Sequence, residues 1–291
     1  MKAVTIIAWL PIVTLPTATV LFTPDDWPRW AFMWLFAWAL FVGCKWLTWY
    51  SVRAGVASAF RQLGYLVAWP GLDAPAFLHT PNPHAPAAFA WLFALAKLCL
   101  GIVLLVGVFP RVPTDYDLVR GWVGMLGVVF VLHFGLFHLL SLGWQALGVT
   151  AKPIMDWPVL SVSVSDFWGK RWNLAFRDLT HRFVFRPLTS RFGAKAALTI
   201  GFLFSGILHE LVISMPARGG WGGPTVFFLL QAVAILVERS TLGQSFSLTR
   251  NLRGWAFTML VLIGPLFLLF HPPFVRVVVV PFLDWIVEPS N

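Results

Sequence analysis

Residues Ala196–Met215 read AALTIGFLFSGILHELVISM, an apolar run with a single acidic side chain, Glu210. About 20 apolar residues is the length that a helix needs to cross the hydrocarbon core of a bilayer. The run also contains His209. Because an ionisable group inside a membrane-spanning helix is energetically unfavourable, its presence there indicates a functional role by default.

Other apolar runs accompany this one along most of the chain. They are Ala3–Phe22, Trp30–Trp49, Ala87–Phe109, Val119–Leu147, Thr225–Val237, Trp255–Phe270 and the short, valine-rich Phe274–Val287. The 291 residues are 58% hydrophobic and 11% charged, whereas a soluble domain carries about a quarter charged residues. We therefore predict an all-α polytopic membrane protein, folded as one domain over residues 1–291. It has about 7–8 transmembrane helices plus interfacial or re-entrant helices.

The basic residues give an orientation. If the amino terminus is cytoplasmic, most Lys and Arg fall in inner loops, above all in Gly148–Lys195, as the positive-inside rule requires. The predicted location is a multi-pass position in an inner or cytoplasmic membrane. The run ending at Phe22 follows Lys2 and could be a signal peptide, but it lacks a clear small-residue cleavage site. We expect it to be retained as a span.

Several functions are disfavoured by residues that are missing. Basic residues outnumber acidic ones, 21 to 12, but they form no stripe on a polar surface, so nucleic acid is not an expected partner. Cys44 and Cys99 lie in apolar runs and indicate neither a disulfide framework nor a zinc site. Ile213 stands where an intramembrane zinc protease would carry a second histidine. We predict no metal.

A polar block, Asp166–Asn173 (DFWGKRWN), lies upstream of His209. Aromatic residues recur at helical spacing through Ser163–Arg186, which predicts an amphipathic helix at the inner membrane surface. Asn173 and Arg177 are four residues apart and share a face of that helix. An alternative interpretation is a positively charged interfacial helix that binds anionic lipid headgroups.

His209 has polar neighbours within its own helix. Ser205 lies one turn earlier on the same face, Gly206 allows close approach of another helix, and Glu210 points about 100° away. The alternative role is a structural histidine between helices. We interpret five further histidines as packing, lining or loop residues: His79, His84, His133, His138 and His271.

The block Asp166–Asn173, followed by Ser205-Gly-Ile-Leu-His-Glu210, resembles the signature of the membrane-bound O-acyltransferase (MBOAT) superfamily, and most of all its wax synthase-like branch. Arg61–Asp73 (RQLGYLVAWPGLD) resembles the amino-terminal half of that branch, so the likeness extends over about 61–210. The resemblance implies an MBOAT-like bundle with a central acyl-transfer chamber. It also implies an acyltransferase that moves an acyl group from acyl-CoA to the hydroxyl of a lipophilic alcohol. The chain is shorter than the larger family members, which implies a reduced bundle.

The resemblance implies catalytic roles for His209 and Asn173. Attack of an alcohol on a thioester needs a base, and histidine, with an ordinary pKa of about 6.5, suits that task. An asparagine amide can stabilise the oxyanion or orient the thioester carbonyl. Residues expected around the substrates and coenzyme A are Asp166, Trp168, Lys170, Arg171, Trp172, Arg177, Ser205 and Glu210. Acyl-CoA is a co-substrate, no bound cofactor is expected, and the other partners are the alcohol and membrane lipids.

Two other functions fit the same residues. One is transfer of a short acyl group, such as acetyl, to a sugar, sterol-like or secondary-metabolite hydroxyl. The other is non-catalytic lipid binding or transport, with His209 and Glu210 as a polar relay. The sequence leaves the oligomeric state open.

Overall fold

The computed structural model describes residues 6–52, 57–81 and 84–287, which form helices joined by loops with no strand among them. The α-helices are α1 (Ile6–Phe22), α2 (Arg29–Tyr50), α3 (Ala59–Ala68), α4 (Ala74–His79), α5 (Ala88–Ile102), α6 (Asp117–Val129), α7 (Phe137–Ala146), α8 (Val164–Asp166), α9 (Leu174–Thr180), α10 (Arg186–His209), α11 (Met215–Ala217), α12 (Gly223–Glu238), α13 (Thr241–Ser245), α14 (Asn251–Ile263), α15 (Leu266–Leu269), α16 (Pro272–Phe274) and α17 (Val280–Val287). Wider π-helical turns cover Val103–Val108, Phe130–Leu136, Phe167–Arg171, His181–Phe185, Glu210–Ser214 and Val275–Val279. Short 3-10 turns cover Phe109–Arg111, Thr114–Tyr116 and Pro158–Leu160.

Five helical runs within the described residues are long and apolar enough to cross a membrane. They are Arg29–Tyr50, Ala88–Arg111, Thr114–Ala146, Leu174–Ala217 and Asn251–Leu269. Two shorter apolar helices, α1 and α12, accompany them. These helices confirm the prediction of an all-α polytopic membrane protein. The predicted run Val119–Leu147 lies, as far as Ala146, in a helical run of 33 residues, Thr114–Ala146.

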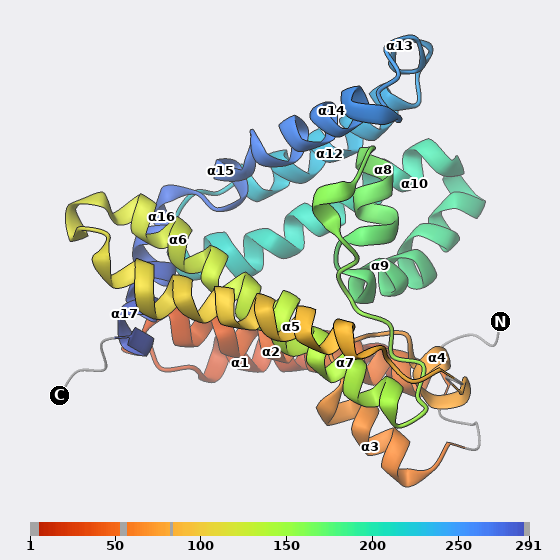
Figure 1. The fold of residues 1–291 in the computed structure, drawn as a ribbon, viewed down its shortest axis with the longest axis horizontal. Helices are drawn as coiled ribbons and strands as arrows, with labels where there is room; N and C mark the ends of the chain where they lie inside the picture. The colour runs from red at the N-terminus through yellow and green to blue at the C-terminus, as the bar shows by residue number, and fades with distance from the viewer. Residues whose placement is uncertain (1–5, 53–56, 82–83, 288–291) are drawn as a thin grey trace. The chain divides into compact units, whose positions relative to one another are not determined.

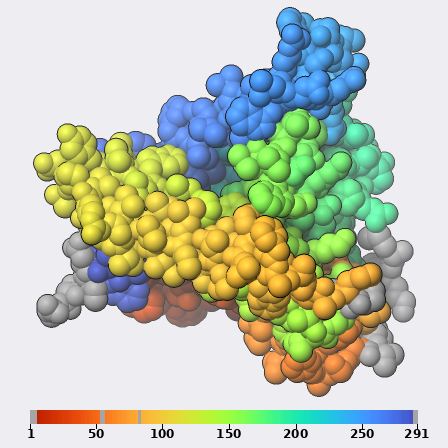
Figure 2. Space-filling model, in the orientation of Figure 1, coloured from red at the N-terminus to blue at the C-terminus, as the bar shows by residue number. Residues whose placement is uncertain are grey.

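The chain divides into two compact units, one made of residues 1–154 and 279–291 and the other of residues 155–278. In the first unit α5 and α6 lie side by side (Figure 1). The space-filling view shows the yellow side chains of these two helices over one face of that unit (Figure 2). Every residue of the predicted catalytic pair belongs to the second unit.

A buried lysine on α2, Lys45, contacts the Arg61–Asp73 stretch in the core of the first unit. The Nζ atom of Lys45 donates to the carbonyl oxygen of Gly71 at 2.6 Å and lies 3.6 Å from the ring centroid of Tyr65. The Tyr65 hydroxyl in turn lies 2.7 Å from the Thr48 hydroxyl. A carbonyl and an aromatic face thus take the place of solvent around the amine. The contacts tie the Arg61–Asp73 stretch to α2, which gives this part of the family-like sequence a structural role.

The second unit is organised around the close contact of α10 with α12. Gly206 of α10 lies against the backbone of Thr225, so a Cβ atom at Gly206 would come within 2.8 Å of the Thr225 Cα atom. Gly201, one and a half turns earlier on α10, faces open space, and a Cβ atom there would have no neighbouring heavy atom within 4 Å. The predicted close approach of another helix at Gly206 is present in the structure.

Replacing Gly206 by alanine is expected to destabilise the protein by about 1–3 kcal/mol, because α12 must move away from α10. The matched change Gly201→Ala adds a methyl group where there is room and should stabilise α10 by up to about 1 kcal/mol. Thermal unfolding of the two detergent-purified variants measures the difference. Equal melting temperatures for the two variants would contradict the close packing at Gly206.

Candidate active site

The polar block begins at a helix start that is capped twice. The Ser163 side chain accepts from the Asp166 backbone N–H at 2.9 Å. Glu238, which is fully buried at the end of α12, accepts from the N–H groups of Val164 and Ser165 at 2.7 and 3.0 Å. Free N–H groups at a helix start are strong donors, and a carboxylate there also meets the positive end of the helix dipole. This carboxylate therefore fixes the block to α12.

Two residues expected around the substrates and coenzyme A, Asp166 and Arg171, form an ion pair with each other. The Nε atom of Arg171 lies 2.5 Å from Oδ2 of Asp166. The same guanidinium donates at 3.3 Å to the carbonyl oxygens of Asp156 and Trp157. Arg171 thus closes the loop before the block, whereas Lys170 beside it is exposed.

The predicted continuous helix over Ser163–Arg186 is wrong at one point. The π-helical turn ends at Arg171, and a new helix, α9, starts after Asn173. Asn173 has a left-handed backbone, with φ 45°, a conformation that asparagine tolerates better than most residues. Helical periodicity continues across the break and gives no sign of it.

The break leaves the Asn173 amide nitrogen available. Its side-chain oxygen caps α9 by accepting from the Phe176 N–H at 3.4 Å, and its backbone N–H points at the Met155 sulfur at 3.3 Å. Among the described residues the amide nitrogen donates to no acceptor. Trp172 stacks on Phe167, with ring centroids 5.4 Å apart, and fixes the chain just before Asn173.

Two other predicted residues of this segment, Arg177 and Trp168, also have partners. Arg177 pairs with the neighbouring Asp178, with its Nε atom 3.0 Å from Oδ1. The indole N–H of Trp168 donates to Gln231 of α12 at 3.4 Å. The block is therefore held to α12 at Trp168 as well as at its start.

The structure fixes the tautomer of His209, the last residue of α10. Its Nδ1 atom lies 2.7 Å from the Ser205 carbonyl oxygen. A carbonyl can only accept, so Nδ1 carries a proton, and in the neutral imidazole Nε2 then keeps its lone pair. The backbone of Ser205 makes this contact, while its hydroxyl donates to Gly201 at 3.1 Å. An imidazole oriented in this way presents a basic nitrogen.

Glu210 follows His209 and turns towards α12. One carboxylate oxygen, Oε1, accepts from the Gly222 N–H at 3.0 Å, from the Thr225 N–H at 3.0 Å and from the Thr225 hydroxyl at 2.9 Å. The other oxygen, Oε2, is buried without a hydrogen-bond partner among the described residues. Glu210 is itself only 8% exposed. The sequence predicts it among the substrate-binding candidates, and the structure places it at the start of a neighbouring helix.

Phe228 of α12 links the two halves of the site. Its ring centroid lies 4.4 Å from that of His209 and 5.6 Å from that of Trp168. Trp168 also packs on a small apolar cluster of Val164, Ala234 and Ile235. The block and the histidine helix thus meet on one face of α12, which brings Trp168 and His209 onto the same aromatic ring.

Sequence reasoning misses three residues of α12. Phe228, Gln231 and Glu238 lie in or directly after a run whose hydropathy indicates only an apolar span. Gln231 and Glu238 are both fully buried. The available signal is the same one that singles out His209, namely a polar or ionisable side chain at a membrane helix.

His271, interpreted from the sequence as a loop residue, does more in the structure. It is buried, its Nδ1 accepts from the Phe274 N–H at 3.2 Å, and its Nε2 lies 3.2 Å from the Ser214 hydroxyl. Burial lowers the pKa of His271, while the nearby Glu210 carboxylate acts in the opposite direction. Because Nδ1 accepts a hydrogen bond, Nε2 carries the proton and cannot act as a base towards Ser214.

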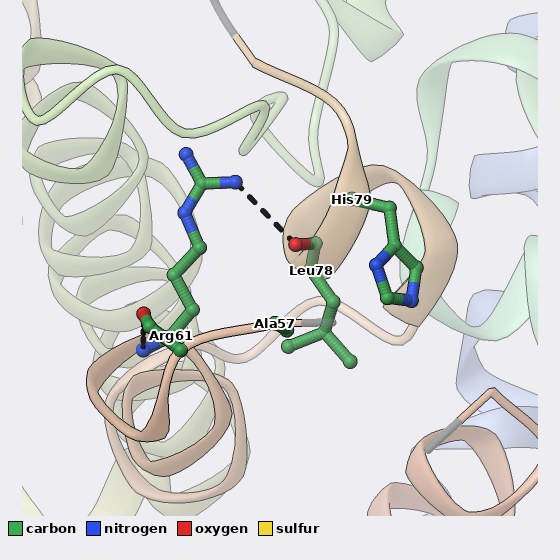
Figure 3. A pocket seen from close by; sticks show the side chains of 5 residues that line it. Ala57, Arg61, Leu78 and His79 are labelled. Atoms are coloured by element: carbon green, nitrogen blue, oxygen red, sulfur yellow. Dashed lines mark hydrogen bonds between the residues drawn. The ribbon is translucent and has the colours of Figure 1, made fainter. Parts of the chain in front are cut away.

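An open pocket in the first unit contains none of the predicted site residues. It measures about 490 Å³ and is lined by Ala57, Ser58, Arg61, Leu78 and His79. Figure 3 shows Arg61 donating across the pocket to the Leu78 carbonyl oxygen, a bond of 3.4 Å. Within the part of the chain that the structure describes, no three His, Cys, Asp or Glu side chains gather as metal ligands.

A family model matches the segment that contains this site, and two curated proteins are similar to part of the chain. Residues 151–230 match the model of the "Membrane bound O-acyl transferase family". A "Probable long-chain-alcohol O-fatty-acyltransferase 9" of Arabidopsis thaliana is 31% identical over 146 residues, covering 45% of this chain and 42% of that protein. The "Long-chain-alcohol O-fatty-acyltransferase" of Simmondsia chinensis is 30% identical over 130 residues, covering 39% of this chain and 37% of that protein.

The chain matches less than half the length of these two relatives. The matched family segment contains both Asp166–Asn173 and Ser205–Glu210. These matches confirm the resemblance to membrane-bound O-acyltransferases and to their wax synthase-like branch.

Proposed function

We propose that this integral membrane protein, similar over residues 151–230 to membrane-bound O-acyltransferases, transfers an acyl group from acyl-CoA to the hydroxyl of a lipophilic alcohol. His209 is the general base and Asn173 holds the oxyanion. The proposal rests most on the Nδ1 contact of His209 with the Ser205 carbonyl, because it leaves Nε2 free to take a proton.

The proposed reaction uses both side chains in one addition and one elimination. Nε2 of His209 takes the hydroxyl proton as the alcohol oxygen attacks the thioester carbonyl. The carbonyl oxygen becomes negative, and the amide N–H of Asn173 stabilises that charge. The intermediate then collapses, the C–S bond breaks, and the imidazolium returns its proton to the departing coenzyme A thiolate. The products are an ester and free coenzyme A.

The site chemistry favours a water-poor setting for this transfer. His209 packs on Phe228, and Trp168 on Phe202 and Phe228. Exclusion of water strengthens hydrogen bonds to the oxyanion and limits hydrolysis of the thioester. An acceptor alcohol soluble in the bilayer could reach such an aromatic site without crossing water.

The proposed function can be tested with purified protein and membranes that contain it. Radiolabelled acyl-CoA donors from acetyl to long-chain acyl are supplied with a long-chain alcohol, and the lipids are extracted and separated. A labelled ester formed from long-chain donors is the expected result. Ester formed only from acetyl-CoA on a sugar or sterol hydroxyl would favour the short-chain alternative, and label bound without any covalent product would favour lipid binding or transport.

We further propose that the donor arrives from the cytoplasmic side, with the amino terminus on the same side. Lys170 is the exposed cation of the Asp166–Asn173 block and is then placed to meet the phosphates of coenzyme A. Lys170→Glu should raise the KM for acyl-CoA on the order of threefold to tenfold, and the effect should shrink at high salt. Initial rates measured across donor concentrations test this.

Lys195→Glu is a matched control, because Lys195 is also exposed but lies outside the block, on α10. It should leave the KM for the donor unchanged. An unchanged KM in Lys170→Glu as well would remove Lys170 from the donor site.

A further inference from the structure

Two buried carboxylates stand at the two ends of α12. At its start, Glu210 accepts three hydrogen bonds from Gly222 and Thr225. At its end, Glu238 accepts two from Val164 and Ser165. Both side chains are more than nine-tenths buried, and none of the salt bridges found among the described residues involves either carboxylate.

These contacts use the donors that helix starts cannot satisfy internally. The first turns of a helix leave N–H groups unpaired, and the helix dipole adds positive charge there. Glu210 thereby joins the histidine helix to the start of α12, and Glu238 joins the end of α12 to the start of the polar block. Removing either carboxylate would leave buried N–H groups without partners.

The contacts of Glu210 and Glu238 lie on either side of the residues proposed to carry out the chemistry. Between them, Phe228 touches the ring of His209 at 4.4 Å and that of Trp168 at 5.6 Å. Gln231 receives the indole N–H of Trp168 and itself donates to the Val261 carbonyl at 3.1 Å, which fixes it from α14. The path from His209 to the block therefore runs through a single helix held at both ends.

We propose that α12 sets the separation between His209 and the Asn173 block, and that Glu210 and Glu238 are the positioning residues at its two ends. This inference rests on the proposed acyl transfer. Glu210 fixes the base, so its loss lowers kcat. Glu238 fixes the block that carries both Lys170 and Asn173, so its loss raises the KM for acyl-CoA and also lowers kcat.

Glutamine distinguishes the two ends, because the carboxylates use their oxygens differently. All three bonds to Glu210 go to one oxygen, which a glutamine amide oxygen can replace. The two bonds to Glu238 go to different oxygens, so glutamine keeps one and turns an NH₂ group towards a backbone N–H. Glu210→Gln should therefore retain the activity that Glu210→Ala loses, whereas Glu238→Gln should be as impaired as Glu238→Ala.

The experiment measures ester formation by Glu210→Ala, Glu210→Gln, Glu238→Ala and Glu238→Gln in the full chain. Losing a buried hydrogen bond to a charged group corresponds to a change of about tenfold or more. We expect kcat to fall by at least about that factor in Glu210→Ala and to stay within about threefold of wild type in Glu210→Gln. Both Glu238 variants should raise the KM for acyl-CoA by about tenfold. Asp156→Asn, which alters an exposed side chain in the same unit, should change neither value.

Hydrogen exchange of the backbone gives a readout that does not depend on activity. Glu238→Gln should expose amides around Val164 and Ser165, and Glu210→Ala those around Gly222 and Thr225. Glu210→Gln as inactive as Glu210→Ala would overturn the positioning role of Glu210 and point to direct use of its charge. A wild-type KM in Glu238→Gln would overturn the positioning role of Glu238. Unchanged hydrogen exchange in Glu210→Ala or in Glu238→Gln would overturn the claim that these carboxylates hold the two ends of α12. Absence of any ester with the wild-type protein would instead overturn the proposed function.

Discussion

Replacing His209 by alanine should lower the rate of ester formation by about 10²–10⁴-fold, the usual contribution of a positioned general base. The side chain forms a hydrogen bond to Ser205 of its own helix and a ring contact with Phe228, so its loss removes few structural contacts. Expression and membrane insertion should be retained. Label from acyl-CoA recovered in ester, per amount of protein in the membrane, is the measurement.

His79→Ala provides the control for this change. His79 is exposed at the end of α4 in the first unit and borders the open pocket there. Its loss should leave ester formation unaltered. Full activity of His209→Ala would exclude the proposed base, whatever the product.

Changing Asn173 to aspartate should lower kcat by about 10²–10³-fold, as expected when one oxyanion donor is lost. Aspartate keeps the side-chain oxygen that caps α9 and tolerates the left-handed backbone at this position. What it removes is the amide N–H and what it adds is negative charge beside the oxyanion. Steady-state kinetics should show this loss in kcat with a nearly unchanged KM for the donor.

Asn173→Gly separates chemistry from backbone strain. Glycine adopts a positive φ without cost, and it caps a helix nearly as well as asparagine. The glycine variant should melt close to wild type and still lose activity. An active glycine variant would mean that Asn173 serves only to turn the chain.

The helices could be predicted because bilayer thickness imposes the length of an apolar run, and these runs appear directly in the sequence. Close packing at Gly206 could be predicted for a different reason, because only a small residue there allows two helix backbones to approach. His209 stood out as an ionisable residue in an apolar span and Asn173 as part of the polar block, while their catalytic roles were implied by the resemblance. The structure adds the protonated nitrogen of His209 and the free amide of Asn173. Their roles remain predictions.

Other features lay outside the reach of periodicity. The left-handed residue at Asn173 divides a segment whose aromatic spacing is helical throughout. The partners of Glu210 and Glu238 are backbone N–H groups at helix starts that are distant in sequence. No local sequence pattern predicts such a long-range contact between a carboxylate and an amide. His271 sits next to Pro272 in sequence, which suggested a loop, yet tertiary packing buries it against Ser214.

The π-helical turn Glu210–Ser214 inserts an extra residue into the span directly after His209. An α-helix advances about 100° per residue, so the chain beyond Ser214 is rotated by about that angle relative to an uninterrupted helix. The span therefore carries two registers, one that packs His209 on α12 and one that turns Ser214 towards His271. A one-residue insertion or deletion in this turn would hardly change length or hydropathy, yet it would disconnect the two registers. In an alignment of related chains, this turn should accept exchanges of one apolar residue for another. Insertions and deletions in it should be rare.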